Sequence, residues 1–362
     1  MRIMNLLHKI SLFLIVLMIG CTDKFNDIPT SSGTGNIGNV GDTVYVKQNP
    51  DWDRNLFNFS KPQDIIVGRE PFIYIANTGN NEIIMMDISG QVLGTKSIFK
   101  PVAIAQDYQL NLIVCGSIIH NNDTLGAVYK INLVAGQHQL NSAPVDTLLP
   151  KTSFDFLKPD REYTGACVFY NNSFYITRRG PSNSSLIDPD NAILIFRQKL
   201  RQDGSKTDTL VGTVPGIQKT GTGIPSLNRL SSITSFNNNS LDIITSLIGE
   251  NSFKVQWLKY VSRPDFEGYE IALSPLSSDM MQINKFARPE DVTIDSRKNI
   301  FIADAEKDSV FKFNSFGDEL ESFGGPDIFD SPHAVAVFDK TVYVVDTNND
   351  RILRFILSTE ID

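Results

Sequence analysis

Short apolar runs of about five residues recur from residue 42 to the end of the chain, and polar turn residues separate them. Phe72-Ile-Tyr-Ile-Ala-Asn77, for example, is followed after a polar stretch by Glu82-Ile-Ile-Met-Met-Asp87. Runs of this length, rich in β-branched and aromatic residues and bounded by Asn, Asp and Gly, are typical of β strands joined by turns. No stretch of residues 42–362 combines a helical period with capping residues. The pattern therefore predicts an all-β fold.

The runs are organised in a repeat. In each of six copies one apolar run opens the unit, and the next run ends fourteen or fifteen residues after that opening. Four copies open with proline, and the two in the middle have another residue in its place. The copies begin at Pro62, Pro101, Tyr163, Leu230, Pro289 and Pro332. Six units of four short strands predict a six-bladed β-propeller.

The copies that open with proline resemble the NHL repeat. The resemblance is carried by Pro289-Glu-Asp-Val-Thr-Ile-Asp, followed by Asn299-Ile-Phe-Ile-Ala-Asp304, and by the matching stretches of the other three copies. It implies a six-bladed propeller of NHL type. Some NHL-type propellers are amidating lyases that hold zinc with histidines near the central channel.

The sixth copy has only three strands after Pro332, the last of them at 352–357. An isolated strand-like run, Asp42-Thr-Val-Tyr-Val-Lys47, precedes the first copy. We therefore expect residues 42–47 to complete the sixth blade and close the ring. The alternative is a last blade that stays open or is completed by a partner.

Residues 1–20 have the pattern of an export signal. Arg2 and Lys9 give the segment a positively charged start. The apolar run that follows, from Ile10 to Ile19, is too short to span a bilayer as a helix. The sequence Leu17-Met-Ile-Gly-Cys21 resembles a bacterial lipobox, which implies cleavage before Cys21 and lipidation of its thiol. The alternative is an ordinary signal peptide followed by an incidental cysteine.

The predicted organisation is a lipoprotein signal at 1–20, a flexible tether at 21–41 and a propeller at 42–362. The tether is rich in Gly, Ser, Thr and Asn, a composition that buries too little apolar surface to fold. Together with charged residues close behind Cys21, it resembles exported lipoproteins of Bacteroidota. We expect the chain to be anchored by lipid to a membrane of the bacterial cell envelope, on the periplasmic or the cell-surface side.

Composition narrows the function classes. The chain has 33 Lys and Arg against 41 Asp and Glu, a net charge of −8. This acidic balance argues against nucleic-acid binding, which needs a basic surface. Three cysteines in 362 residues are too few for a disulfide scaffold. Cys115 and Cys167 fall within predicted strands and are expected to be small buried side chains.

An Asp or Asn ends the second strand in several copies: Asn77, Asp304 and Asp346. Such side chains accept hydrogen bonds from backbone N–H groups of a following turn. Because the position recurs in several blades, we expect a structural role for it rather than a catalytic one.

The loops between blades gather on one face of a propeller, so residues just after the opening residue of each copy are expected at its rim. They are Gln63, Thr164, Ser231, Glu290, Asp291 and His333. The loop of the third copy from Arg178 and Arg179 to Asp190 is long. Two adjacent arginines are suited to clamp a carboxylate or a sugar acid. The alternative is that they are solvated charges, paired with Asp188 or Asp190.

Catalytic motifs are absent: the sequence has no Gly-x-Ser-x-Gly elbow, phosphate-binding loop or Cys-x-x-Cys pair. A three-histidine metal site would need His120, His138 and His333 together, and His138 is expected at an outer strand. We therefore expect no metal or cofactor, although carbonyl and carboxylate ligands for Ca²⁺ in the channel are compatible with the sequence. The expected function is a binding or scaffold module for a protein, peptide or glycan. The alternative is a metal-dependent lyase or hydrolase with its site at the channel.

Overall fold

The computed structural model describes residues 44–236 and 238–360. The predicted signal at 1–20, the predicted lipidation site Cys21 and the predicted tether up to residue 41 lie outside the described residues. Among the described residues, no helix has the length and apolar character needed to cross a membrane.

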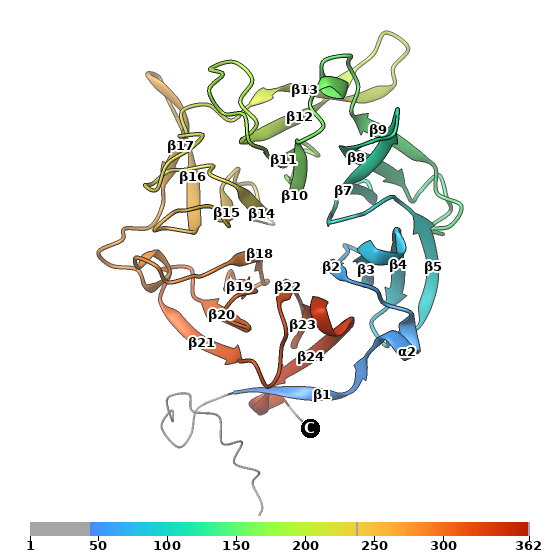
Figure 1. Cartoon of the computed structure of the whole chain (residues 1–362), viewed down its shortest axis with the longest axis vertical. Coiled ribbons are helices and arrows are strands. Elements are labelled where there is room, and N and C mark those ends of the chain that lie inside the picture. Colours follow the sequence, from blue (N-terminus) through green and yellow to red (C-terminus); the bar gives the residue numbers. More distant parts are fainter. Residues whose placement is uncertain (1–43, 237, 361–362) are drawn as a thin grey trace, which may run out of the picture. The chain divides into compact units, whose positions relative to one another are not determined.

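The described residues form a six-bladed β-propeller, as the repeat predicts (Figure 1). Each blade is an antiparallel sheet of four strands, and the blades are numbered here in chain order. Blade 1 contains β2 (Pro62–Val67), β3 (Phe72–Asn77), β4 (Glu82–Asp87) and β5 (Val92–Ser97). Blade 2 contains β6 (Ala103–Gln106), β7 (Asn111–His120), β8 (Asp123–Asn132) and β9 (Val145–Leu149). Blade 3 contains β10 (Glu162–Val168), β11 (Phe174–Arg179), β12 (Ala192–Leu200) and β13 (Lys206–Thr213).

The second half of the ring is built in the same way. Blade 4 contains β14 (Leu230–Ser235), β15 (Ile243–Leu247), β16 (Val255–Arg263) and β17 (Phe266–Ile271). Blade 5 contains β18 (Pro289–Ile294), β19 (Ile300–Asp304), β20 (Ser309–Phe313) and β21 (Glu319–Gly324). Blade 6 contains β22 (Pro332–Phe338), β23 (Thr341–Asp346), β24 (Arg351–Leu357) and β1 (Tyr45–Trp52). The helical turns are α2 (Arg54–Phe57), η1 (Thr78–Asn80), η2 (Asp155–Leu157), η3 (Asp279–Met281), η4 (Thr347–Asn349) and η5 (Ser358–Glu360).

The N-terminal strand closes the ring, as predicted. β1 lies antiparallel beside β24, with Tyr45 opposite Leu357 and Trp52 opposite Ile352 (Figure 1). Residues 42 and 43 of the predicted strand lie outside the described residues. At its other end the strand extends five residues beyond the predicted end at Lys47, to the buried Trp52. Blade 6 is therefore made from both ends of the described chain.

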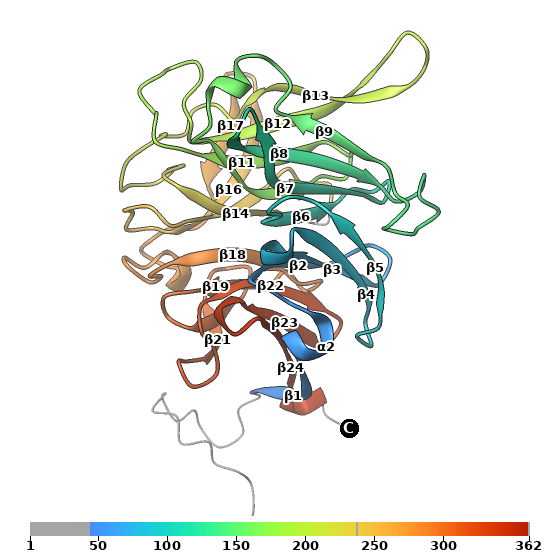
Figure 2. The same cartoon turned by 45° about the vertical axis from the view of Figure 1, so that its right-hand side comes forward.

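The middle copies differ from the pattern in two places. In blade 4, Leu230 pairs with Leu247 and not with Thr245, because the turn between β14 and β15 is longer than its counterparts. In blade 3, the hairpin of β12 and β13 projects outward from the ring (Figures 1 and 2). These insertions make the middle copies longer than the others.

The core lies between the blades. Each cluster of buried apolar residues combines side chains of two neighbouring blades, as where Tyr74 and Ile83 of blade 1 pack with Leu112 and Ile131 of blade 2. The cluster that joins blades 6 and 1 also includes Trp52. Burial of these sheet faces, worth about 25 cal/mol per Å² of apolar area, stabilises the ring as a whole.

Candidate functional site

Five blades carry a β-bulge at the start of their innermost strand. The register shifts immediately after the opening residue, so that the next residue is an extra one without a partner of its own on the second strand. A bulge redirects the side chain of the extra residue. The bulge residues are Gln63, Thr164, Ser231, Glu290 and His333. They are five of the six residues that the repeat predicts at the rim, and the sixth, Asp291, directly follows Glu290.

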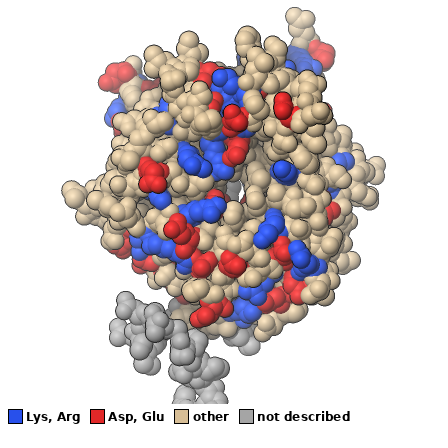
Figure 3. All heavy atoms as spheres, in the orientation of Figure 1, with Lys and Arg blue, Asp and Glu red and all other residues tan. Residues whose placement is uncertain are grey.

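The bulge residues line one cavity of about 520 Å³ at the centre of the ring. Inner strands of all six blades contribute to its wall. A smaller cavity of about 280 Å³ is lined by the later residues of the same strands. Seen face-on, the central opening of the ring is surrounded by Lys and Arg side chains with acidic ones between them (Figure 3). The central channel is therefore a concave site to which all six blades contribute.

Most of the sequence-predicted ligand residues lie at this cavity. Gln63, Arg179, Glu290, Asp291 and His333 all line it. Arg178 does not. The prediction that both arginines lie on a loop is wrong, because they are the last two residues of β11.

Arg178 is buried, with 4% of its surface exposed, and holds the loop that follows its strand. Its guanidinium donates to the backbone oxygens of Pro189 at 2.5 Å and Asp190 at 3.1 Å, and to the Asp188 carboxylate at 2.9 Å. Its Nε and Nη2 donors are therefore used inside the protein. Arg178 and Arg179 do not form a clamp together, since only Arg179 lines the cavity.

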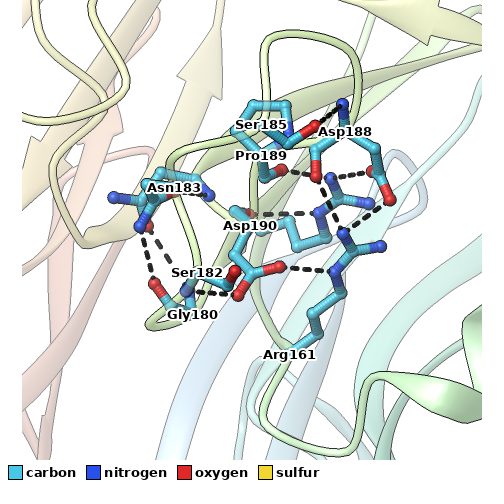
Figure 4. Close-up of polar contacts among 10 residues, drawn as sticks. Arg161, Gly180, Ser182, Asn183, Ser185, Asp188, Pro189 and Asp190 are labelled. Atoms are coloured by element: carbon cyan, nitrogen blue, oxygen red, sulfur yellow. Dashed lines mark hydrogen bonds and ion pairs between the residues drawn. The ribbon is translucent and has the colours of Figure 1, made fainter.

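Arg161 completes this network and was not singled out by the sequence. Its Nε donates to Asp190 at 2.8 Å and its Nη2 donates to Asp188 at 2.7 Å (Figure 4). The second oxygen of Asp190 accepts the backbone N–H of Ser182 at 2.7 Å. Arg161 also lines the cavity. The network thus fixes the loop of residues 180–191 beside the site.

Asn77, Asp304 and Asp346 are fully buried at the ends of their strands. They accept backbone N–H groups of the loop that precedes the blade: Asn77 from Ser60 at 2.8 Å and Asp346 from Asp330 at 2.7 Å. The sequence placed these bonds in the following turn, but the nearest donors lie sixteen or seventeen positions earlier. Bonds to the turn after the strand exist as well: Asp304 accepts weaker bonds from the backbone N–H groups of Glu306 at 3.2 Å and Lys307 at 3.3 Å, and Asp346 accepts one from the side chain of Asn349 at 2.8 Å.

Asp304 shows what this arrangement does for the site. Its carboxylate accepts the backbone N–H groups of Ala287 at 2.7 Å and Arg288 at 2.8 Å. Arg288 lines the cavity and directly precedes the inner strand of blade 5. The strand-end carboxylate therefore positions a cationic side chain at the mouth of the channel.

Hydroxyl groups link the inner strands around the ring. Thr164 donates to the carbonyl of Leu230 at 3.0 Å, and Ser231 donates to that of Pro289 at 2.6 Å. Thr347 donates in the same way to Pro62, at 2.6 Å. Each acceptor is the opening residue of the next blade. Thr164 and Ser231, predicted at the rim, therefore line the cavity while their hydroxyls join neighbouring blades.

Charged pairs stand at the mouth of the cavity. Arg179 Nε bonds Glu162 at 2.6 Å, and Arg288 Nε lies 2.5 Å from Glu290. The side chain of Glu290 is 9% exposed and that of Arg288 is half exposed. Burial lowers the pKa of His333, partly offset by the charge of Glu290, so this imidazole is neutral at pH 7.

Asp64 and Asp291 form a second feature of the cavity wall; Asp291 was predicted at the rim, whereas Asp64 and the pairing of the two carboxyls were not. Each follows a bulge residue, lines the cavity and accepts a backbone N–H of the next blade: Asp64 from Ile104 at 2.5 Å, Asp291 from Val335 at 3.0 Å. Burial raises the pKa of both carboxyls, and the negative charge of Asp291 raises that of Asp64 further. In the sequence, the only sign of this pair is an Asp two positions after the opening proline in two of the six copies, at Asp64 and Asp291.

We expect this pair to make stability depend on pH. Because the pKa of each carboxyl is higher in the folded state, the folded protein binds more protons from about pH 3.8 up through the folded pKa. The unfolding free energy therefore falls as pH rises through that window. Asp291→Asn removes one ionisable partner, so its stability relative to the parent should be higher at pH 7.5 than at pH 4.5, as measured by urea unfolding. Asp265→Asn, in an exposed turn, is the control; an equal response of both variants would contradict the assignment.

The histidines do not come together. His120 packs against the ring of Phe156, and His138 pairs with Glu70 at 3.1 Å, away from His333. Among residues 44–236 and 238–360, no three His, Cys, Asp or Glu side chains are grouped as a metal site. Cys115 and Cys167 are buried and are not joined by a disulfide.

No protein-family model matches the sequence, and a search of curated proteins gives no match. The NHL resemblance of the repeats therefore stays a prediction. Among solved structures, the fold is similar to an auxiliary nutrient binding protein of Bacteroides thetaiotaomicron, with a TM-score of 0.56, 11% identity, and coverage of 83% of this chain and 69% of that one.

Two further structures are similar at the same level. One is a protein of unknown function from Bacteroides thetaiotaomicron, with a TM-score of 0.52, 13% identity, and coverage of 86% of this chain and 73% of that one. The other is the PQQ-bound aldose sugar dehydrogenase of Streptomyces coelicolor, with a TM-score of 0.53, 11% identity, and coverage of 88% of this chain and 99% of that one. Identities this low show a shared fold, and propellers of this kind include both binding proteins and enzymes.

Proposed function

We propose that this chain is a binding module of the bacterial cell envelope whose partner, a protein segment, peptide or glycan, enters the cavity at the centre of the ring. One observation carries the proposal: bulge residues of five separate blades converge on a single cavity of about 520 Å³. This volume is within the range of about 300–1,000 Å³ that small-molecule sites have. Anchoring through a lipid on Cys21 is part of the proposal and rests on the sequence alone.

The rigidity of the mouth supports a recognition role. Hydroxyl bonds between blades and the strand-end carboxylates fix the backbone on which the bulge residues stand. A site held by strands needs little reordering when a ligand arrives, which favours binding. The similarity to a nutrient binding protein adds an analogy at the level of fold.

The alternative is a metal-dependent lyase or hydrolase at the channel. It would require ligands beyond the carboxylates and the single histidine at the mouth, since the described residues offer no group of three. Elemental analysis of the purified protein distinguishes the binding module from the metal-dependent enzyme. One transition metal bound per chain would favour the enzyme.

Blocking the cavity tests the proposal. Gln63→Trp places a large side chain at the mouth, and Val102→Trp does so from the neighbouring blade. Soluble glycans and peptides are screened with the full-length protein by thermal shift. Ligands that raise the melting temperature of the parent should not raise that of either variant. Val134→Trp, on an exposed loop outside the cavity, should still be stabilised by these ligands. Ligands that stabilise all three variants equally would show that the cavity is not the binding site.

A further inference from the structure

The mouth of the cavity carries cationic groups whose donors are only partly used. Arg179 and Arg288 each pair with one glutamate through Nε, and their terminal nitrogens have no hydrogen-bond partner among the described residues. Lys100, in the loop before blade 2, also lines the cavity, and its ammonium group lies 5.4 Å from the ring of Phe99. These three cations come from three different parts of the ring. Guanidinium groups with two free nitrogens bind a carboxylate in a forked geometry.

Acceptors stand next to these donors. The carboxylate of Glu290 pairs with Arg288 Nε at 2.5 Å through its buried oxygen Oε1, and none of the described residues donates a hydrogen bond to its other oxygen, Oε2. His333, neutral at pH 7, has one ring nitrogen that accepts and one that donates. A ligand that uses both groups must offer hydroxyl groups in addition to an anion.

Deeper in the cavity, Asp64 and Asp291 add further polar groups. Their raised pKa favours the protonated acid, which donates a hydrogen bond where a carboxylate would only accept. Of the described residues that line the cavity, Tyr163 is the one with a phenyl-type ring, and it is buried. Recognition here must therefore rest on polar contacts rather than on stacking against an aromatic surface.

From these observations we infer that the cavity binds a sugar acid: a ligand that carries one carboxylate and several hydroxyl groups. The carboxylate lies between Arg179 and Arg288, and the hydroxyl groups donate to Glu290 and bond His333. This inference rests on the proposed binding function and specifies its ligand. It replaces the arginine pair expected from the sequence by two arginines of different blades.

Calorimetric titration of the full-length protein tests the inference. Glucuronate and galacturonate are compared with glucose and galactose, which lack the carboxylate, and with acetate, which lacks the hydroxyl groups. We expect the two sugar acids to bind at least about tenfold more tightly than the neutral sugars and acetate, because a hydrogen bond to a charged group contributes about 1.5–3 kcal/mol.

Matched variants assign the effect to the site. Arg179→Gln and Arg288→Gln should each weaken binding of the sugar acids about tenfold or more. Arg263→Gln, which removes an exposed arginine paired with Glu270 on the outer hairpin of blade 4, should leave it unchanged. Unfolding midpoints of the variants check that the fold is kept.

Other outcomes would separate this inference from the proposed function. Neutral sugars that bind as tightly as the acids, absence of binding by both acids, or unchanged affinity in Arg179→Gln and Arg288→Gln would each overturn the sugar-acid assignment. The cavity would still be the binding site if Gln63→Trp abolished binding of another ligand. If Gln63→Trp changed the binding of no ligand, both would fail.

Discussion

Deletion of residues 44–52 is expected to abolish the cooperative unfolding transition of the whole propeller. These residues include β1, which supplies the outer strand of blade 6 and connects it to both neighbouring blades. Without it, β24 becomes an open edge and the ring has no closure. The loss should exceed the 5–15 kcal/mol that stabilises a typical protein.

The contacts of β1 explain the size of this effect. At one end, Tyr45 donates its backbone N–H to Glu321 of blade 5 at 2.9 Å, and its ring lies 4.7 Å from that of Phe323. At the other end, Trp52 is 3% exposed, lies 5.8 Å from the ring of Tyr343 and packs on the turn of blade 1 at Gly90. One strand therefore holds three blades together.

Urea unfolding followed by circular dichroism measures the effect. The point variant Trp52→Ala should by itself cost about 3–5 kcal/mol. Leu56→Ala, at a side chain that is 63% exposed, is the matched control and should change stability little. A protein without residues 44–52 that unfolds with the midpoint and slope of the parent would disprove closure by β1.

Arg161→Ala is expected to destabilise the protein by about 3–5 kcal/mol, because it leaves the buried carboxylate of Asp190 without its cationic partner. Only the backbone N–H of Ser182 would then bond that carboxylate. The arginine also bonds Asp188, so the loop of residues 180–191 loses two of its attachments. Arg263→Ala, which removes an exposed ion pair, should cost less than about 1 kcal/mol.

A double-mutant cycle identifies the pair that is responsible. If Arg161 acts through Asp190, the double variant Arg161→Ala with Asp190→Ala should be far less destabilised than the sum of the two single variants. Additive effects would mean that the two side chains contribute independently. Urea unfolding of the four proteins at pH 7 provides the comparison.

The architecture could be predicted from the sequence because the propeller is built from repeated units. The offset from Pro62 to Asn77, found again from Pro289 to Asp304, follows from one strand, one turn and a second strand, so the same spacing reports the same blade. The closing strand could be predicted since the sixth copy lacked its outer strand. Residues at the bulge could be placed at the rim from their position in the repeat.

The interactions between blades could not be predicted in this way. Arg178 occupies in blade 3 the position of Asn77 in blade 1, yet it donates to backbone oxygens of the loop that follows, a choice that depends on the inserted loop. The proximity of Asp64 and Asp291 depends on how blades 1 and 5 are placed around the channel. Spacing along the chain says nothing of distances across a ring.

The closure by β1 also has a consequence for biosynthesis. The backbone N–H of Val44 bonds the hydroxyl of Ser358, 314 positions later in the chain, and Tyr45 pairs with Leu357. β1 emerges from the ribosome long before β24, and until then Tyr45 and Trp52 have no partner on that strand. Contacts this distant in sequence form late, and an uncovered strand edge is prone to aggregation. We therefore expect the ring to close only after the last strands have been synthesised, so that the edge of β1 stays uncovered until then.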